Sequence, residues 1–332
     1  MPLSLRRGIV TAVVERLGSL VRLEVDGVPC VAYPRLTGSV ALEDDVLVNT
    51  QARELELGSG GFDVLYANLT RGLDLPPEES AHVMLLPYTP LQLTTRFAEE
   101  DGPLADSLAG RPVICCSLHS QVGPVLAGLG AGPRVAYVQV AGGALPVSLS
   151  DTVRSLQAHG LVERTAAVSP CLDADAQCVT IHSALAWAGA SGCDAVVCAI
   201  GPGIVGTASR LGHGGLSAAD AANAAVALEG SAIVAVRVST ADARERHHGV
   251  SHHTRGLLAL CDEGVTAAWP AGLARPAWLS RHEEIDVTGW ERACADLPLS
   301  PLSHMGRGLG DDPWFFASAF AAGRLARSRL DG

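Results

Sequence analysis

A dense group of histidines has the residue types of a metal or acid–base site. Residues 247–253 read His-His-Gly-Val-Ser-His-His, so four of the eleven histidines lie within seven residues. Neutral imidazole is the commonest transition-metal ligand and also exchanges protons near neutral pH. We predict His248, His252 and His253 as metal ligands, and His248 and His252 also as catalytic groups. Because the spacing matches no established zinc signature, a divalent metal site, a metal-free substrate or acid–base site and a solvated loop all stay open.

Residues outside this run are expected to complete the site. Asp242 lies just upstream and would add a carboxylate, while His119 or His213 from other loops would add an imidazole. We predict His119 and Asp242 as catalytic groups. Ser117 or Ser120 beside His119 offers the alternative of a serine nucleophile. Side chains this close in sequence seldom face each other, however, and the chain has no G-x-S-x-G turn.

A glycine-rich segment follows one of the apolar runs. Gly201, Gly203 and Gly206 match G-x-G-x-x-G, the dinucleotide fingerprint in which backbone amides approach a pyrophosphate. Two features depart from it. Further glycines within residues 212–215 interrupt the helix that should follow, and Asp242 lies 36 residues beyond Gly206 (242 − 206) rather than about 20. An anion- or substrate-binding loop is favoured over a dinucleotide site, with a structural turn as the third interpretation.

The ligand expected at this segment is a phosphate or a carboxylate. Thr207 would supply a hydroxyl and Arg210 a guanidinium, which can grip an oxyanion with two hydrogen bonds. Gly142 and Gly143 follow another apolar run. Together with the three fingerprint glycines, they would let a ligand approach bare backbone.

The composition excludes several chemistries. All 24 cationic side chains are arginine, because the 332-residue chain contains no lysine. A lysine Schiff base, a pyridoxal phosphate anchor and a P-loop lysine are therefore excluded. The nine cysteines show no C-x-x-C pair, so neither a disulfide framework nor a zinc ribbon is expected.

The charge and hydropathy patterns restrict the partners. A formal charge of −11 disfavours nucleic acid, although an arginine-lined pocket could still hold an anion. No apolar run reaches about 18 uncharged residues, and the first residues lack a signal-peptide pattern. We therefore expect no membrane partner and a cytoplasmic location.

From about residue 111, apolar runs alternate with alanine-rich helical stretches, which is typical of βαβ units around a parallel sheet. The six runs expected as strands are residues 112–116, 134–140, 164–168, 194–200, 233–238 and 265–268. Ser251 is expected to cap a helix, and Ser217 with Asp220 is expected to form a capping box. In doubly wound sheets ligands bind beyond the carboxyl ends of the strands, where the candidate residues lie.

Residues 8–69 have a different pattern of short β-rich runs separated by turn signals such as Asp26-Gly27. The expected strands are residues 8–14, 19–25, 28–33, 45–49, 53–57 and 62–68. We predict a small barrel of OB or SH3 type over residues 1–75 and an α/β domain over residues 80–332. The fold class is thus α/β, with a parallel doubly wound sheet and a small N-terminal all-β, barrel-like domain.

Several short runs resemble those of a bacterial family known only as a domain of unknown function. The most specific are residues 201–207, Gly-Pro-Gly-Ile-Val-Gly-Thr, and residues 249–254, Gly-Val-Ser-His-His-Thr. The other similar runs are residues 57–62, 82–92, 118–121 and 142–146. The resemblance spans nearly the whole chain and implies a shared architecture, but no substrate or activity.

The expected function is binding of a small anionic molecule in one glycine- and histidine-rich crevice at the strand ends. A metal-assisted hydrolase or transferase would use these residues. A non-catalytic ligand sensor or interaction protein and a dinucleotide-binding oxidoreductase are the alternatives. A homo-oligomer is also an open expectation, because the barrel is expected to be a dimer surface or a structural appendage rather than a substrate lid.

Overall fold

The computed structural model describes residues 3–56, 60–73, 75–76, 78–299 and 302–332. By its internal contacts the chain divides into two units, Met1–Arg96 and Phe97–Gly332. The division falls after Arg96, whereas the sequence pattern places the break near residues 75–80. Residues 57–59, which begin one of the family-like runs, lie outside the described residues.

The first unit contains a closed five-stranded barrel in the order β1-β2-β3-β5-β4. Its strands are β1 (Leu5–Leu17), β2 (Leu20–Val25), β3 (Val28–Ala32), β4 (Asp45–Asn49) and β5 (Asp63–Asn68). The β2–β3 hairpin turns at Asp26 and Gly27, which both have positive φ, as a type I′ turn requires. Alternate strand residues such as Val21, Leu23 and Val25 fill the interior. The predicted barrel is confirmed.

Two helical turns and a hairpin complete this unit. They are α1 (Pro34–Thr37), α2 (Gln51–Glu54) and the antiparallel pair β6 (Val83–Leu85) and β7 (Leu93–Thr95). The prediction of a strand over residues 53–57 is wrong for its described part. The Glu54 amide donates to the Thr50 carbonyl at 3.0 Å, and the Thr50 hydroxyl donates to the Glu54 carboxylate at 2.6 Å, so local bonds close a helical turn there. Leu57 lies outside the described residues.

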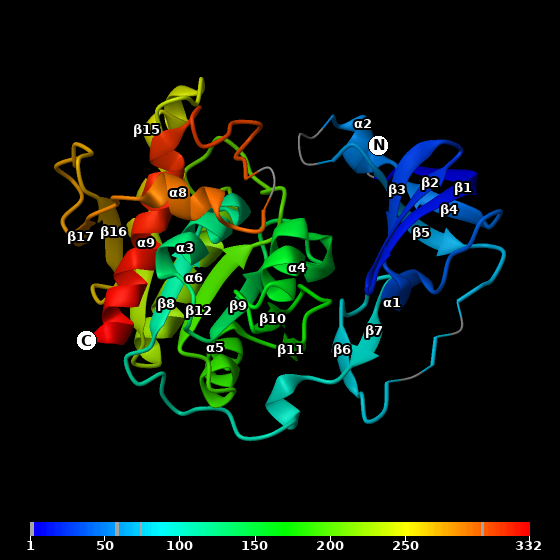
Figure 1. The fold of residues 1–332 in the computed structure, drawn as a ribbon. Coiled ribbons are helices and arrows are strands. Elements are labelled where there is room, and N and C mark those ends of the chain that lie inside the picture. The colour runs from blue at the N-terminus through cyan, green and yellow to red at the C-terminus, as the bar shows by residue number, and fades with distance from the viewer. Residues whose placement is uncertain (1–2, 57–59, 74, 77, 300–301) are drawn as a thin grey trace. The chain divides into compact units, whose positions relative to one another are not determined.

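The second unit is built on an eight-stranded parallel sheet in the order β11-β10-β9-β12-β8-β13-β16-β17 (Figure 1). Its strands are β8 (Pro112–Cys116), β9 (Val135–Val140), β10 (Arg164–Val168), β11 (Ala176–Cys178), β12 (Ala195–Ile200), β13 (Ser231–Ala235), β16 (Thr266–Pro270) and β17 (His282–Ile285). All six predicted strands are present. The sequence missed β11, which is short, and β17, which has two glutamates and no apolar run.

Helices cover both faces of the sheet, as expected for a doubly wound fold (Figure 1). One face carries α3 (Val122–Leu129), α4 (Asp151–Ala158), α8 (Trp290–Ala295) and α9 (Pro313–Asp331). The other carries α5 (Ile181–Ala190), α6 (Ser217–Ala227) and α7 (His252–Leu258). The strands are buried on both sides, with Val113 and Cys115 facing one core and Ile114 and Cys116 the other. The predicted parallel doubly wound sheet is confirmed.

Short elements lie in the connections. They are the 3-10 turns η1 (Ala98–Glu100), η2 (His119–Gln121), η3 (Val147–Leu149), η4 (Gly214–Leu216) and η5 (Glu245–His247), and the antiparallel pair β14 (Val238–Ser239) and β15 (Gly249–Val250). Ser251 caps α7 as predicted, since its hydroxyl oxygen accepts a hydrogen bond from the His253 amide at 3.2 Å. The predicted capping box of Ser217 and Asp220 is wrong, because α6 starts at Ser217 after Leu216 and has no side-chain cap.

The sheet has a switch point between two central neighbours, β8 and β12. The chain leaves β8 into α3 on one face, but it leaves β12 towards α6 on the opposite face. The two connections therefore diverge beyond the carboxyl ends of adjacent strands. In doubly wound proteins, ligands commonly bind at such a switch point.

The nine cysteines are all buried and unpaired. Burial raises the pKa of Cys171 and Cys294 to about 12. These buried thiols therefore act as small core residues.

Candidate functional site

Histidine, arginine and aspartate side chains gather beyond the carboxyl ends of β12 and β13. One segment follows β12, a second spans residues 237–253 after β13, and a third spans residues 304–312 before α9. The ring contact of His213 with His253 connects the first two segments, and the ion pair of Arg307 with Asp242 connects the last two. The members, called the histidine–arginine cluster below, are His213, Arg237, Asp242, Arg244, His247, His252, His253, His304, Arg307 and Asp312.

Four imidazole rings pack together in this cluster. His213 stacks on His253 with ring centroids 3.9 Å apart, and His252 lies 4.4 Å from His253 and 5.4 Å from His213. The His247 ring contacts both His252 and His253 at 4.8 and 4.9 Å. One potential ligand atom from each of His213, His252 and His253 lies within 4.8 Å of the other two. These three residues therefore have the proximity that a shared metal requires.

Several nitrogens of these rings lack protein partners. Nε2 of His252 and both ring nitrogens of His213 are buried without a well-aligned hydrogen bond, although the Arg210 backbone lies near enough to raise the pKa of His213. In contrast, Nδ1 of His247 bonds the Ser251 hydroxyl at 2.8 Å, and Nδ1 of His253 accepts from Nη1 of Arg237 at 3.1 Å. Buried polar atoms are almost always paired, so unpaired ones call for an explanation such as a missing ion or water.

Burial keeps the imidazoles of the cluster neutral. It lowers the pKa of His253 to about 2 and the pKa values of His247 and His304 to about 3, with the charge of Arg237 as the second cause. Burial likewise lowers the pKa of His213 and of His252. Neutral imidazole is the form that binds a metal.

Arginines surround the Asp242 carboxylate. Its Oδ2 atom lies 2.8 Å from Nη2 of Arg244, 3.4 Å from Nη2 of Arg237 and 3.6 Å from Nη2 of Arg307. Hydrogen bonds from Arg244 are the main reason why the pKa of Asp242 lies far below its usual range. Asp312 pairs with Nε of Arg307 at 3.2 Å and accepts the Ser239 hydroxyl at 2.6 Å. Asp242 is committed to arginines rather than to a metal or a proton transfer.

The structure brings His252 and His253 together as predicted, but it places His248 differently. His248 is exposed and lies outside the group of convergent ligand atoms. The neighbouring His247 ends the η5 turn with its ring buried, and the following residue turns outward. His213, which the sequence offered only as an alternative to His119, takes the third position.

His119 lies in a separate network. Because the Ile200 carbonyl can only accept, its contact with Nδ1 at 3.2 Å places the ring proton there, and Nε2 accepts the Ser150 hydroxyl at 2.7 Å. Burial lowers the pKa of His119 to about 4. Ser120 instead contacts Nδ1 of His304 at 3.0 Å. His119 thus connects the loops after β8, β9 and β12, and both of its nitrogens are occupied.

The glycines predicted to cradle a ligand lie against the backbone of neighbouring loops. A Cβ atom on Gly142 would lie 2.5 Å from the Gly214 carbonyl oxygen, and one on Gly143 would lie 2.2 Å from that of Gly201. On Gly201 it would lie 2.1 Å from the carbonyl oxygen of Ala144. The space beside these glycines is filled by neighbouring loops. Close packing of the crevice loops therefore explains why side chains are absent there.

The segment after β12 folds back on itself rather than starting a helix. Gly203 has a φ of 72°, and Gly206 pairs with His213 as an antiparallel bridge. Thr207 and Arg210 lie exposed at the tip of this excursion. The next helix, α6, begins only after η4. This geometry departs from the dinucleotide fingerprint, in which the helix follows the glycines at once. The bridge to Gly206 instead fixes the position of His213.

Comparison with known proteins places the chain in a family. A protein-family model described as a protein of unknown function (DUF3866) matches residues 29–323. The chain belongs to the DUF3866 family. A search among curated proteins found no match. The expectation of a family of unknown function is thereby confirmed. The matched range includes residues from both units of this DUF3866 protein.

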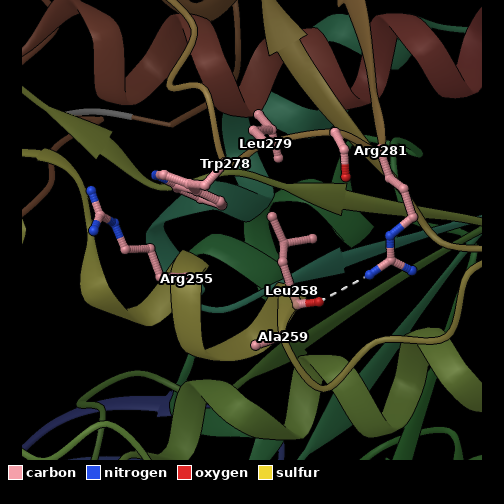
Figure 2. Close-up of a pocket in the computed structure, with 7 residues that line it drawn as sticks. Arg255, Leu258, Ala259, Trp278, Leu279 and Arg281 are labelled. Carbon is pink, nitrogen blue, oxygen red and sulfur yellow. Dashed lines mark hydrogen bonds between the residues drawn. The ribbon is translucent and has the colours of Figure 1, made fainter.

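A small pocket lies beside α7 (Figure 2), and none of its lining residues belongs to the histidine–arginine cluster. It has a volume of about 190 Å³, below the ~300 Å³ typical of ligand sites. Figure 2 shows the Arg255 and Trp278 side chains on one side, with the guanidinium 5.1 Å from the ring centroid. On the other side Arg281 donates to the Leu258 carbonyl at 3.2 Å, at the end of α7. The pocket holds no acid–base or nucleophilic pair.

Sequence reasoning missed Arg237, His304 and Arg307 in this DUF3866 protein. Arg237 lies near the end of the apolar run 233–238. An arginine inside such a run was the sequence signal that could have identified it. His304 and Arg307 belong to an irregular segment without periodicity, so their place became visible only in three dimensions. Among the described residues, no helix is long and apolar enough to cross a membrane.

Proposed function

We propose that this protein is a metal-dependent hydrolase or transferase acting on a small anionic molecule, with the metal held by His213, His252 and His253. The supporting observation is the convergence of three neutral imidazoles, two of which have buried nitrogens without partners. Three protein ligands leave a coordination position for water or substrate, as in catalytic rather than structural zinc sites. A metal held there would polarise the substrate or lower the pKa of a bound water.

The donor set favours particular metals. It consists of imidazoles alone, because Asp242 is held by arginines. Imidazole suits zinc, iron, nickel and copper, whereas magnesium and calcium require oxygen ligands. We therefore expect a borderline transition metal such as zinc.

Arg237 is coupled to this site through His253. A guanidinium can only donate, so its bond to Nδ1 places the proton of His253 on Nε2. Metal coordination by His253 must then compete with Arg237. Arg237 can keep an ion pair when it releases His253, since its Nη2 atom lies 3.4 Å from Asp242. His213 and His252 need no such exchange.

Metal binding by untagged protein tests the proposal. We expect elemental analysis and zinc titration calorimetry to show one ion per chain. His252→Ala, which removes a partly exposed ligand, should weaken zinc binding at least roughly tenfold, and His213→Ala should do the same. His248→Ala is the matched control and should bind zinc like the wild type. The absence of stoichiometric binding, or equal loss in the His248 variant, would contradict the proposed centre.

A further inference from the structure

We infer that Arg237, Arg307 and His304 form a binding site for a small oxyanion, the phosphate or carboxylate group of the molecule on which the protein acts. The assignment of this anion as a substrate group rests on the proposed function, but the site itself does not. It lies on the arginine side of the histidine–arginine cluster. Neither Thr207 nor Arg210, which the sequence suggested for an anion, takes part.

The charges of the cluster do not balance. Arg237, Arg244 and Arg307 face two carboxylates, Asp242 and Asp312. One positive charge is therefore left over. The Arg237 side chain is only 2% exposed, so solvent screens it poorly. Burying an excess of positive charge is costly, and a bound anion would compensate it.

Three buried nitrogens in this part of the cluster also lack hydrogen-bond partners. They are Nε of Arg237, Nη2 of Arg307 and Nε2 of His304. Arg307 Nη2 is 3.6 Å from Asp242 Oδ2, beyond hydrogen-bonding distance, and the same oxygen is 3.4 Å from Arg237 Nη2. The Arg237 and Arg307 guanidinium groups therefore both lie near the Asp242 carboxylate, and each keeps one N–H donor without an acceptor.

His304 can supply the third donor. Its ring stacks on Phe315 at 3.8 Å and is 4% exposed as a residue. Its Nδ1 lies 3.0 Å from the Ser120 hydroxyl. When that hydroxyl donates, the ring proton is on Nε2, the atom without a partner. Two guanidinium nitrogens and one imidazole N–H would then all be donors, which fits an oxyanion and excludes a cation at this position.

The two halves of the cluster share one side chain. Arg237 contacts His253 through Nη1 and Asp242 through Nη2. An oxyanion held by Arg237 would thus lie next to the three-histidine group. This arrangement suits a substrate whose charged group is anchored by arginine while an adjacent bond is exposed to the metal.

Thermal unfolding of chelator-treated full-length protein tests the anion site without any metal. Inorganic phosphate and succinate are titrated separately, with sodium chloride at equal ionic strength as the baseline. We expect at least one of the two oxyanions to raise the Tm saturably by several degrees, and the larger shift identifies the preferred group. A Tm that follows ionic strength alone would overturn the inference.

Two variants make the test specific. Arg307→Gln removes a charge and the unpaired Nη2, and should weaken oxyanion binding at least about tenfold, whereas the exposed Arg292→Gln should leave it unchanged. Should Arg307→Gln fail to fold, His304→Gln serves instead. Unchanged binding in the folded variant would overturn the site. Oxyanion binding without zinc binding supports this inference and contradicts the proposed metal enzyme, and the reverse result contradicts only this inference.

Discussion

Four buried histidines make the stability of the protein sensitive to mild acid. The folded-state pKa values of His119, His247, His253 and His304 are about 4, 3, 2 and 3, whereas an unfolded histidine titrates near ~6.5. Below about pH 6.5 the unfolded chain binds more protons than the fold. Each histidine then removes about 1.4 kcal/mol of stability per pH unit until its folded pKa is reached.

We expect the free energy of unfolding in urea to fall by several kcal/mol between pH 7 and pH 5. His119→Gln should make this dependence shallower by about one proton, because the folded-state pKa of His119 is about 4. Asp242 does not change the stability between pH 7 and pH 5, because its carboxyl group is ionised in both the folded and the unfolded chain there. Its lowered pKa in the folded state stabilises the fold, and this stabilisation is lost only in stronger acid. Equal stability at the two pH values would contradict the burial of neutral histidines.

At the level of single residues, the sequence identified the histidine group but not its partners. His252 and His253 could be placed at the start of a helix because Ser251 is a strong cap. His248 and His247 differ only in the direction in which adjacent residues of a turn point, and this direction depends on tertiary packing. Arg307 and His304 are distant in sequence, and no local pattern linked them to Asp242.

The crevice elements depend on contacts between glycine backbones. A Cβ atom on Gly214 would lie 2.0 Å from the carbonyl oxygen of Gly142, and neither backbone can give way without moving its loop. We expect Gly214→Ala to lower the free energy of unfolding by about 2 kcal/mol or more, measured by urea denaturation. Gly310→Ala is the matched control, since its added methyl would meet nothing within 4 Å. Similar stabilities for the two variants would show that the loops are not in contact.

Strands that are buried on both faces could be predicted from the sequence, whereas the partly exposed edge strand β17 could not. Strands β8, β9, β10 and β12 are buried on both faces, so they appear in the sequence as continuous apolar runs. The edge strand β17 is bonded on one side only and its residues are charged, so it gave no such signal. The segment at Gln51–Glu54 is helical because of hydrogen bonds with Thr50, which hydropathy does not record.

The whole molecule consists of two units, and the candidate site belongs entirely to the second. All members of the histidine–arginine cluster lie within Phe97–Gly332, which has cores on both faces of its own sheet. We therefore expect a fragment of residues 97–332 to fold alone. Near-UV circular dichroism and a cooperative urea transition measure this. Zinc affinity equal to that of the full chain is expected, and a fragment without cooperative unfolding would contradict the independence of the unit.

The distribution of cysteines offers a way to follow the two units separately. Cys30 lies in the barrel and the other eight cysteines lie in the second unit, and all of them are buried. A thiol reagent can modify each one only when the surrounding structure opens. After proteolysis of the labelled chain, an adduct mapped to Cys30 would record opening of the barrel, and adducts mapped to the other eight cysteines would record opening of the second unit. The native cysteines therefore report the opening kinetics of both units, and no cysteine has to be introduced.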